Sequence, residues 1–182
     1  SSPMAVGARC LHLRPGLAVV ASQGNTDPAL GRRLLDLLAD GMVPEAALAS
    51  LRGERLIESR QLGLVDALGR VAAFTGDGPE PAKGQILGEG FVVLGNHLAS
   101  DRVLPAMRDA FLASAGQPLE ARLVAAVTAG RDAGGDRSGC RSAPSAGAPG
   151  LSLLPRRACP SAWAPSSTRC LWSASCVTAS RG

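Results

Sequence analysis

The chain has 182 residues, of which 46% are hydrophobic, and its formal charge is +4; this is the length of one globular domain. A membrane-spanning or secreted protein is excluded in our interpretation, because no apolar run approaches the roughly 18 residues of a membrane helix and no signal-peptide pattern opens the chain. Residues 1–137 hold 15 acidic and 14 basic residues, and aromatic residues are 3% of the chain, so we expect a cytoplasmic protein without a nucleic-acid surface.

The first part of the chain predicts a strand followed by two helices. Residues 16–22, GLAVVAS, form a short apolar run typical of a buried strand. A helix is predicted over 28–40, because leucines recur there at three- and four-residue spacing. Thr26 or Asp27 is placed to accept a hydrogen bond from its first turn. A shorter helix is predicted over 44–51.

The second part repeats this order of strands and paired helices. Residues 60–76 predict a β-hairpin, since two apolar runs bracket the turn sequence DALG. Residues 76–90 are rich in Gly and Pro and predict a loop. A strand over 91–96 and two helices within 101–128 follow. Strands that alternate with paired helices indicate helices packed on sheets, an α+β or layered α/β domain.

The pattern of strands and helices stops near residue 138. Residues 144–182 are mostly Ala, Ser, Pro, Arg, Gly and Cys, without a helical or strand period. Two interpretations stay open: a disordered basic tail, or GC-rich coding DNA read out of frame. Four cysteines lie between residues 138 and 182 without the spacing of a metal site, so we predict neither a metal nor a cofactor; they are Cys140, Cys159, Cys170 and Cys176.

Three stretches carry polar residues where strands are predicted to end. GNTDPALG, at 24–31, lacks the Lys-Ser/Thr of a phosphate-binding loop, so its first interpretation is a helix cap. Asn96 and His97 follow the predicted strand 91–96; a histidine there is either a general base or a packing residue. Asp136 lies in the turn sequence GGDRSG, which either approaches a ligand or only reverses the chain.

Four stretches of the sequence form a pattern when they are taken together: NTDPALGRRLLDLLADG, RQLGLVDALGRVAAFTG, GEGFVVLGNHL and AGGDRSGCRSA. In this order and at similar spacing, they resemble the domain-of-unknown-function family 1028. The resemblance implies an Ntn-hydrolase fold, a layered α-β-β-α sandwich. Catalytic members of that superfamily cleave amides with an N-terminal Thr, Ser or Cys as nucleophile, whose free amine is the base.

The resemblance also implies a cleft and a class of substrate. In such a sandwich, polar groups at strand ends would line the cleft and supply oxyanion donors; here these are Asn25, Thr26, Asn96 and Asp136. The parent protein would be an amidohydrolase acting on a small molecule or peptide. The alternative is a non-catalytic binding or assembly module of the same fold, and a homo-oligomer is compatible with either.

The chain departs from the family pattern in three places. Family members begin some twenty residues earlier, so the nucleophile is expected upstream of Ser1 and the domain over 1–143 would lack its N-terminal strand. Near 140–145 the sequence leaves the family pattern, which suggests a reading-frame error. Lys83, Gly84 and Gln85 stand where members carry an aromatic residue and a His. We therefore predict a sandwich incomplete at both ends, without activity and without a cooperative thermal transition.

Overall fold

The computed structural model describes residues 9–79, 82–137 and 174–178. Its elements in chain order are β1 (Leu11–Arg14), β2 (Ala18–Gly24), α2 (Pro28–Ala39), α3 (Pro44–Ala49), the 3-10 helix η1 (Ile57–Ser59), β3 (Arg60–Asp66), β4 (Val71–Thr75), β5 (Gly84–Gly88), β6 (Phe91–Gly95), α4 (Val103–Ala113), α5 (Leu119–Asp132) and β7 (Ala174–Thr178). No helix in this part of the chain is both long and apolar enough to cross a lipid bilayer.

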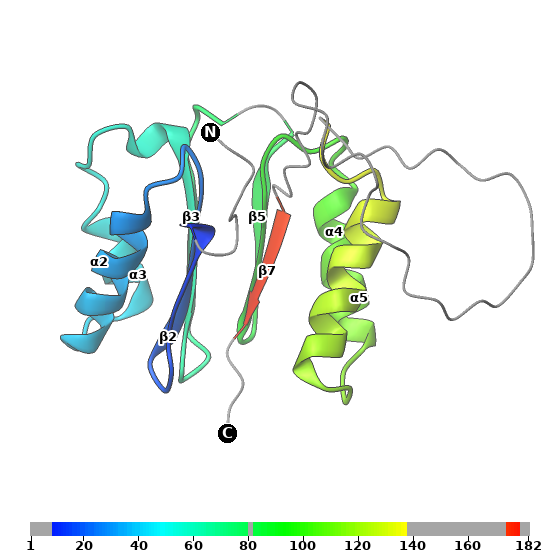
Figure 1. The fold of residues 1–182 in the computed structure, drawn as a ribbon, viewed down its shortest axis with the longest axis horizontal. Helices are drawn as coiled ribbons and strands as arrows, with labels where there is room; N and C mark the ends of the chain where they lie inside the picture. The colour runs from blue at the N-terminus through cyan, green and yellow to red at the C-terminus, as the bar shows by residue number, and fades with distance from the viewer. Residues whose placement is uncertain (1–8, 80–81, 138–173, 179–182) are drawn as a thin grey trace, which may run out of the picture.

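Two antiparallel sheets lie face to face, with a pair of helices on each outer side (Figure 1). The first sheet has the order β1-β2-β3-β4 and the second β5-β6-β7. Helices α2 and α3 share an apolar core with the first sheet, and α4 and α5 share another with the second. The predicted mixed α/β character, with helices packed on sheets, is therefore confirmed.

The alternation of side chains along β3 explains how one strand serves two cores. Leu62 and Leu64 are fully buried against the helix side of the first sheet. Val65 is fully buried in the core between the two sheets, together with Leu94 of β6. Gly63 lies opposite Leu94, where a β-carbon would come within 2.5 Å of Leu94 Cδ1. The glycine therefore lets the two sheets approach closely.

The prediction of a loop over 76–90 is wrong in its second half. Residues Gly84–Gly88 form β5, which pairs with β6 through the turn at Glu89 and Gly90. Gly90 has a φ of 72°, the left-handed conformation that a tight turn requires. Only three residues between the glycines of β5 carry side chains, too few for a period to be recognised, and the strand forms because β6 supplies hydrogen bonds.

Two strands lie where the sequence pattern predicts none. Strand β1 pairs with β2 at the edge of the first sheet, and β7 pairs with β6 at the edge of the second. Strand β7 comes from within residues 144–182, which we predict to be disordered or out of frame. Residues 138–173 and 179–182 lie outside the described residues, so that prediction is not tested.

Strand β1 carries two exposed leucines. Leu11 is paired with Ala21 and Leu13 with Val19, and paired residues of antiparallel strands point to the same face. Ala21 and Val19 belong to the core between the sheets. The second sheet has three strands in the described part of the chain against four in the first. Leu11 and Leu13 consequently remain 46% and 69% exposed.

Candidate functional site

One end of the sandwich collects polar side chains from both sheets. In the first sheet, Gln61 at the start of β3 is paired with Thr75 at the end of β4. In the second sheet, Gly84 at the start of β5 is paired with Gly95 at the end of β6. The Gln61 Nε2 group donates to the carbonyl oxygens of Gly84 and Gly95, at 2.8 and 3.0 Å. The two sheets are thus joined here; we call this region the polar end.

Five side chains at the polar end form a hydrogen-bonded group that we call the amide cluster: Gln23, Gln61, Thr75, Gln85 and Asn96. Gln23 Nε2 and Asn96 Nδ2 both donate to Gln61 Oε1, at 2.7 and 3.1 Å. Gln61 Nε2 also lies 2.8 Å from Thr75 Oγ1, so its two hydrogens are shared among three acceptors, and Thr75 Oγ1 donates to Gln85 Oε1 at 2.9 Å. The donors and acceptors follow one direction through the cluster, so each bond polarises the next.

Gln61 is the centre of this cluster and is fully buried, while Gln23 is 5% exposed. A buried amide costs free energy unless its donors and its acceptor are paired, and both ends of the Gln61 amide are paired. The cluster contains no titratable side chain, so it can give and accept hydrogen bonds but cannot act as a general base.

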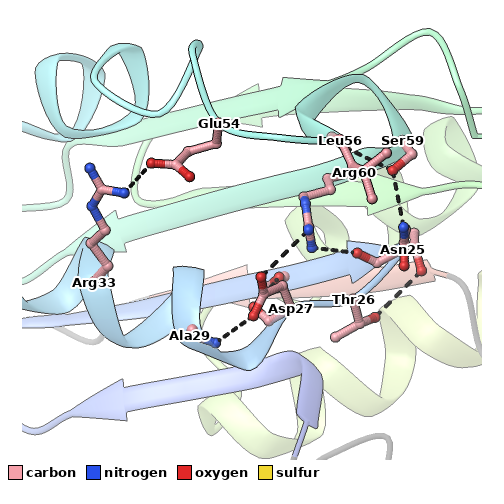
Figure 2. Close-up of polar contacts among 11 residues, drawn as sticks. Asn25, Thr26, Asp27, Ala29, Arg33, Glu54, Leu56, Ser59 and Arg60 are labelled. Carbon is pink, nitrogen blue, oxygen red and sulfur yellow. Dashed lines mark hydrogen bonds and ion pairs between the residues drawn. The ribbon is translucent and has the colours of Figure 1, made fainter.

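A second polar group lies on the other face of β3, at the start of α2 (Figure 2). Arg60 precedes Gln61, and successive strand residues point to opposite faces. The Arg60 side chain is 9% exposed; its Nη2 lies 3.4 Å from Asp27 Oδ2 and its Nη1 donates to the Asn25 carbonyl at 2.7 Å. In the described part of the chain Arg60 Nε has no hydrogen-bond partner. This arginine fixes the turn between β2 and α2.

The turn between β2 and α2 caps the helix. Of the two residues predicted for this role, Thr26 and Asp27, the structure shows Asp27 as the cap. Asp27 is the N-cap of α2, and its Oδ1 accepts a hydrogen bond from Ala29 N at 2.9 Å. Pro28 has no N–H, and Leu30 N donates to the Asp27 carbonyl at 3.2 Å. The first N–H groups of the helix are thus already paired, which agrees with the absence of a phosphate-binding motif.

Removing the cap tests this assignment. We expect Asp27→Ala to lower the free energy of unfolding by about 1 kcal/mol, because the Ala29 N–H loses its acceptor. Asp27→Asn keeps a capping oxygen and loses only the charge opposite Arg60, so it should cost less than Asp27→Ala. Urea unfolding of both variants measures the difference; equal losses would show that the ion pair, and not the cap, stabilises the turn.

Two non-glycine residues with positive φ lie beside the polar end. His97, with φ of 56°, directly follows Asn96, and Leu56, with φ of 62°, shortly precedes Ser59 and Arg60. They are the only non-glycine residues with positive φ in the described part of the chain. Such conformations cost free energy and are concentrated at functional sites. Their positions mark the polar end as the candidate site.

The four predicted cleft residues are distributed over both faces of β3. Asn96 is in the amide cluster, bonded to Gln61. Asn25 is on the Arg60 side, where its Nδ2 donates to Ser59 Oγ at 3.3 Å. Thr26 is adjacent, with its Oγ1 3.5 Å from the Gly24 carbonyl. Asp136 pairs with Leu98 in an isolated bridge and so lies near the segment that follows β6.

The sequence did not indicate Gln23, Gln61 or Arg60 as site residues. Each lies in an apolar strand pattern, where a polar residue has no visible partner until the sheets are assembled.

Of the residues that depart from the family pattern, Gln85 joins the amide cluster. Lys83 Nζ donates to the carbonyls of Gly76 and Asp77, at 2.8 and 2.6 Å. Within the described residues no group of three or more His, Cys, Asp or Glu could hold a metal ion.

Comparison with known proteins identifies the family. The chain is similar to protein SPO2555 from Silicibacter pomeroyi, whose crystal structure is known. The two share 35% sequence identity with a TM-score of 0.67, and the match covers 71% of this chain. The match spans 58% of that chain, which is itself assigned to DUF1028. The comparison with curated proteins gave no match. The model of the family of unknown function DUF1028 matches residues 1–145. The chain therefore belongs to the DUF1028 family.

Proposed function

We propose that DUF1028 proteins hydrolyse amide bonds in the manner of Ntn hydrolases, and that the described part of this chain forms a substrate-binding wall. The order of layers, helices outside two facing sheets, supports an Ntn-type sandwich (Figure 1).

The observation that carries this proposal is the hydrogen bonding of the Asn96 side chain. Its Nδ2 gives one hydrogen to Gln61 Oε1. The second N–H and the Oδ1 of this half-buried side chain have no hydrogen-bond partner within the described residues. A side-chain amide held in this way can donate to a substrate carbonyl and accept from a substrate N–H. The donor is the kind of group that stabilises an oxyanion during amide cleavage.

The adjacent backbone supports the same role. His97 holds a left-handed conformation immediately after Asn96, and Arg137 N donates to the His97 carbonyl at 2.8 Å. This contact ties the segment after β6 to the turn that contains Asp136. Asn96 is thus held on one side by Gln61 and on the other by a braced turn, a preorganised arrangement of the kind that binding sites need.

Titration with N-acetylglycinamide tests the binding. We expect the probe to shift the side-chain amide resonances of Asn96 in an NMR spectrum. Asn96→Ala should weaken binding by about 2- to 12-fold, which corresponds to one neutral hydrogen bond. Gln117→Ala, a change of an exposed amide on another surface, should leave the affinity unchanged. Equal affinity in both variants would remove Asn96 from the site.

A second candidate function is a non-catalytic binding or assembly module. It is favoured by the amide cluster, which contains no titratable side chain. An amide-mimicking electrophile distinguishes the two functions when it is applied to a DUF1028 protein that carries a Thr, Ser or Cys at its mature N-terminus. Labelling of that first residue, lost when it alone is changed, supports the hydrolase; absence of labelling in a folded protein supports the module.

A further inference from the structure

A surface pocket of about 250 Å³ lies beside β4, on the helix side of the first sheet. Leu48, Ile57, Leu62 and Phe74 supply apolar side chains to its lining, and Leu87 of β5 also lines it. This volume is just below the usual range for small-molecule sites, which are mostly apolar with a few polar groups. The pocket is separate from Asn96, so its ligand need not be the amide substrate.

Two opposite charges stand on the rim of this pocket. Glu45 on α3 and Arg52 just beyond it both line the pocket and are exposed. Neither side chain forms a hydrogen bond or ion pair with another described residue. Arg52 lies beyond α3, in a turn where Arg52 N donates to the Ala49 carbonyl. The seven positions from Glu45 to Arg52 therefore rise by about 10–12 Å, at about 1.5 Å per residue in the helix and about 2.0 Å in the turn. The rim therefore offers a separate site for a cationic group and for an anionic group.

The pocket also follows a free sheet edge. Gly76 N donates to the Arg60 carbonyl at 3.0 Å, so these two residues form a hydrogen-bonded pair of the β3–β4 ladder. Hydrogen-bonded and non-hydrogen-bonded pairs alternate along antiparallel strands. The backbone N–H and C=O groups of Val71 and Ala73 therefore point away from β3. The Ala73 carbonyl accepts from Gln85 Nε2 at 3.2 Å. The N–H groups of Val71 and Ala73 have no partner in the described part of the chain. An added strand could accept hydrogen bonds from both.

We propose that this pocket binds an apolar tripeptide with free ends, added as a strand along β4. A fully extended chain spans about 3.3–3.6 Å per residue, so three residues are close in length to the rise between the backbone positions of Glu45 and Arg52. The peptide amine meets the Glu45 carboxylate and the peptide carboxylate meets the Arg52 guanidinium. The peptide carbonyls accept from the β4 edge, and its side chains contact the apolar lining, as in other cases of strand addition.

The test is an NMR titration of the whole isotope-labelled chain with the peptide Ala-Leu-Ala. We expect the backbone N–H resonances of Val71 and Ala73 to shift. N-acetylation or C-amidation of the peptide should each weaken binding by about 2- to 5-fold, the range of exposed ion pairs. Glu45→Gln should abolish the effect of N-acetylation alone, and Arg52→Gln the effect of C-amidation alone.

The control is Glu120→Gln, the same loss of charge at an exposed position on α5, which should keep both capping effects. The two rim residues are exposed, so their variants should keep the spectrum of the folded chain. The proposal is overturned if Val71 and Ala73 do not shift, or if capping the peptide has the same effect in all three variants. It is also overturned if capping has no effect on the unchanged chain.

Discussion

Gln61→Leu is expected to lower the free energy of unfolding by about 3–5 kcal/mol. Gln61 is fully buried, and leucine has a similar size but cannot hydrogen-bond. Five groups would lose a hydrogen bond with Gln61: Gln23 Nε2, Asn96 Nδ2, Thr75 Oγ1 and the carbonyls of Gly84 and Gly95. Each lost hydrogen bond costs about 0.5–1.5 kcal/mol, and the apolar gain of leucine offsets only part of the sum.

Urea unfolding followed by circular dichroism measures this loss. Gln117→Leu is the matched control, because it makes the same exchange at an exposed position and should change stability by no more than about 0.5 kcal/mol. The slope of the transition should stay constant in both variants if the native state keeps its compactness. If the two variants are equally stable, the amide cluster does not hold the sheets together.

The second large effect concerns the contact between the two sheets. Leu94→Ala is expected to lower the free energy of unfolding by about 2–5 kcal/mol, because Leu94 is fully buried between the sheets and its loss leaves a cavity. Gly63→Ala alone should also destabilise the protein, by about 1–3 kcal/mol, since the new β-carbon would come within 2.5 Å of Leu94 Cδ1.

The double variant separates this contact from a general loss of stability. When Leu94 is alanine, the β-carbon added at Gly63 enters space that the leucine has left. The double variant should therefore lose less than the sum of the two single losses, by about 0.5–3 kcal/mol, as neighbours in contact do. The double-mutant cycle is measured by urea unfolding. Strict additivity would show that Gly63 and Leu94 are not in contact, and hence that the two sheets do not pack as described.

Much of the fold could be predicted from the sequence, because several elements carry a local signal. The leucine spacing of α2 and the cap at Asp27 act within a few residues, and the structure places that helix at Pro28–Ala39. The β3–β4 hairpin has its turn residues between two apolar runs. Strand β5 has no such signal, because its pairing with β6 and its contacts across the sheets determine its conformation.

The candidate site was only partly predictable for a related reason. Asn96 is a candidate from the sequence because it follows a strong strand pattern, and the structure places its side chain beside Gln61. Gln61 was missed because its partners come from four other strands or strand ends, and no spacing in the sequence reports that Gln23 and Thr75 will meet it. Asn25 shares the polar end with Asn96, yet β3 separates them, since Arg60 and Gln61 point to opposite faces.

The exposed leucines of β1 also bear on how the protein behaves at high concentration. Leu11 and Leu13 lie on an edge strand, and an uncovered apolar edge strand favours aggregation with other chains. Residues 1–137 have nearly equal numbers of acidic and basic side chains, so their net charge is close to zero. The electrostatic repulsion between two such molecules is weak and does not prevent contact between their edge strands. The colloidal stability of the protein should therefore depend on the charge of residues 138–182, which hold five arginines and no acidic residue. Added salt, which screens that charge, should promote turbidity.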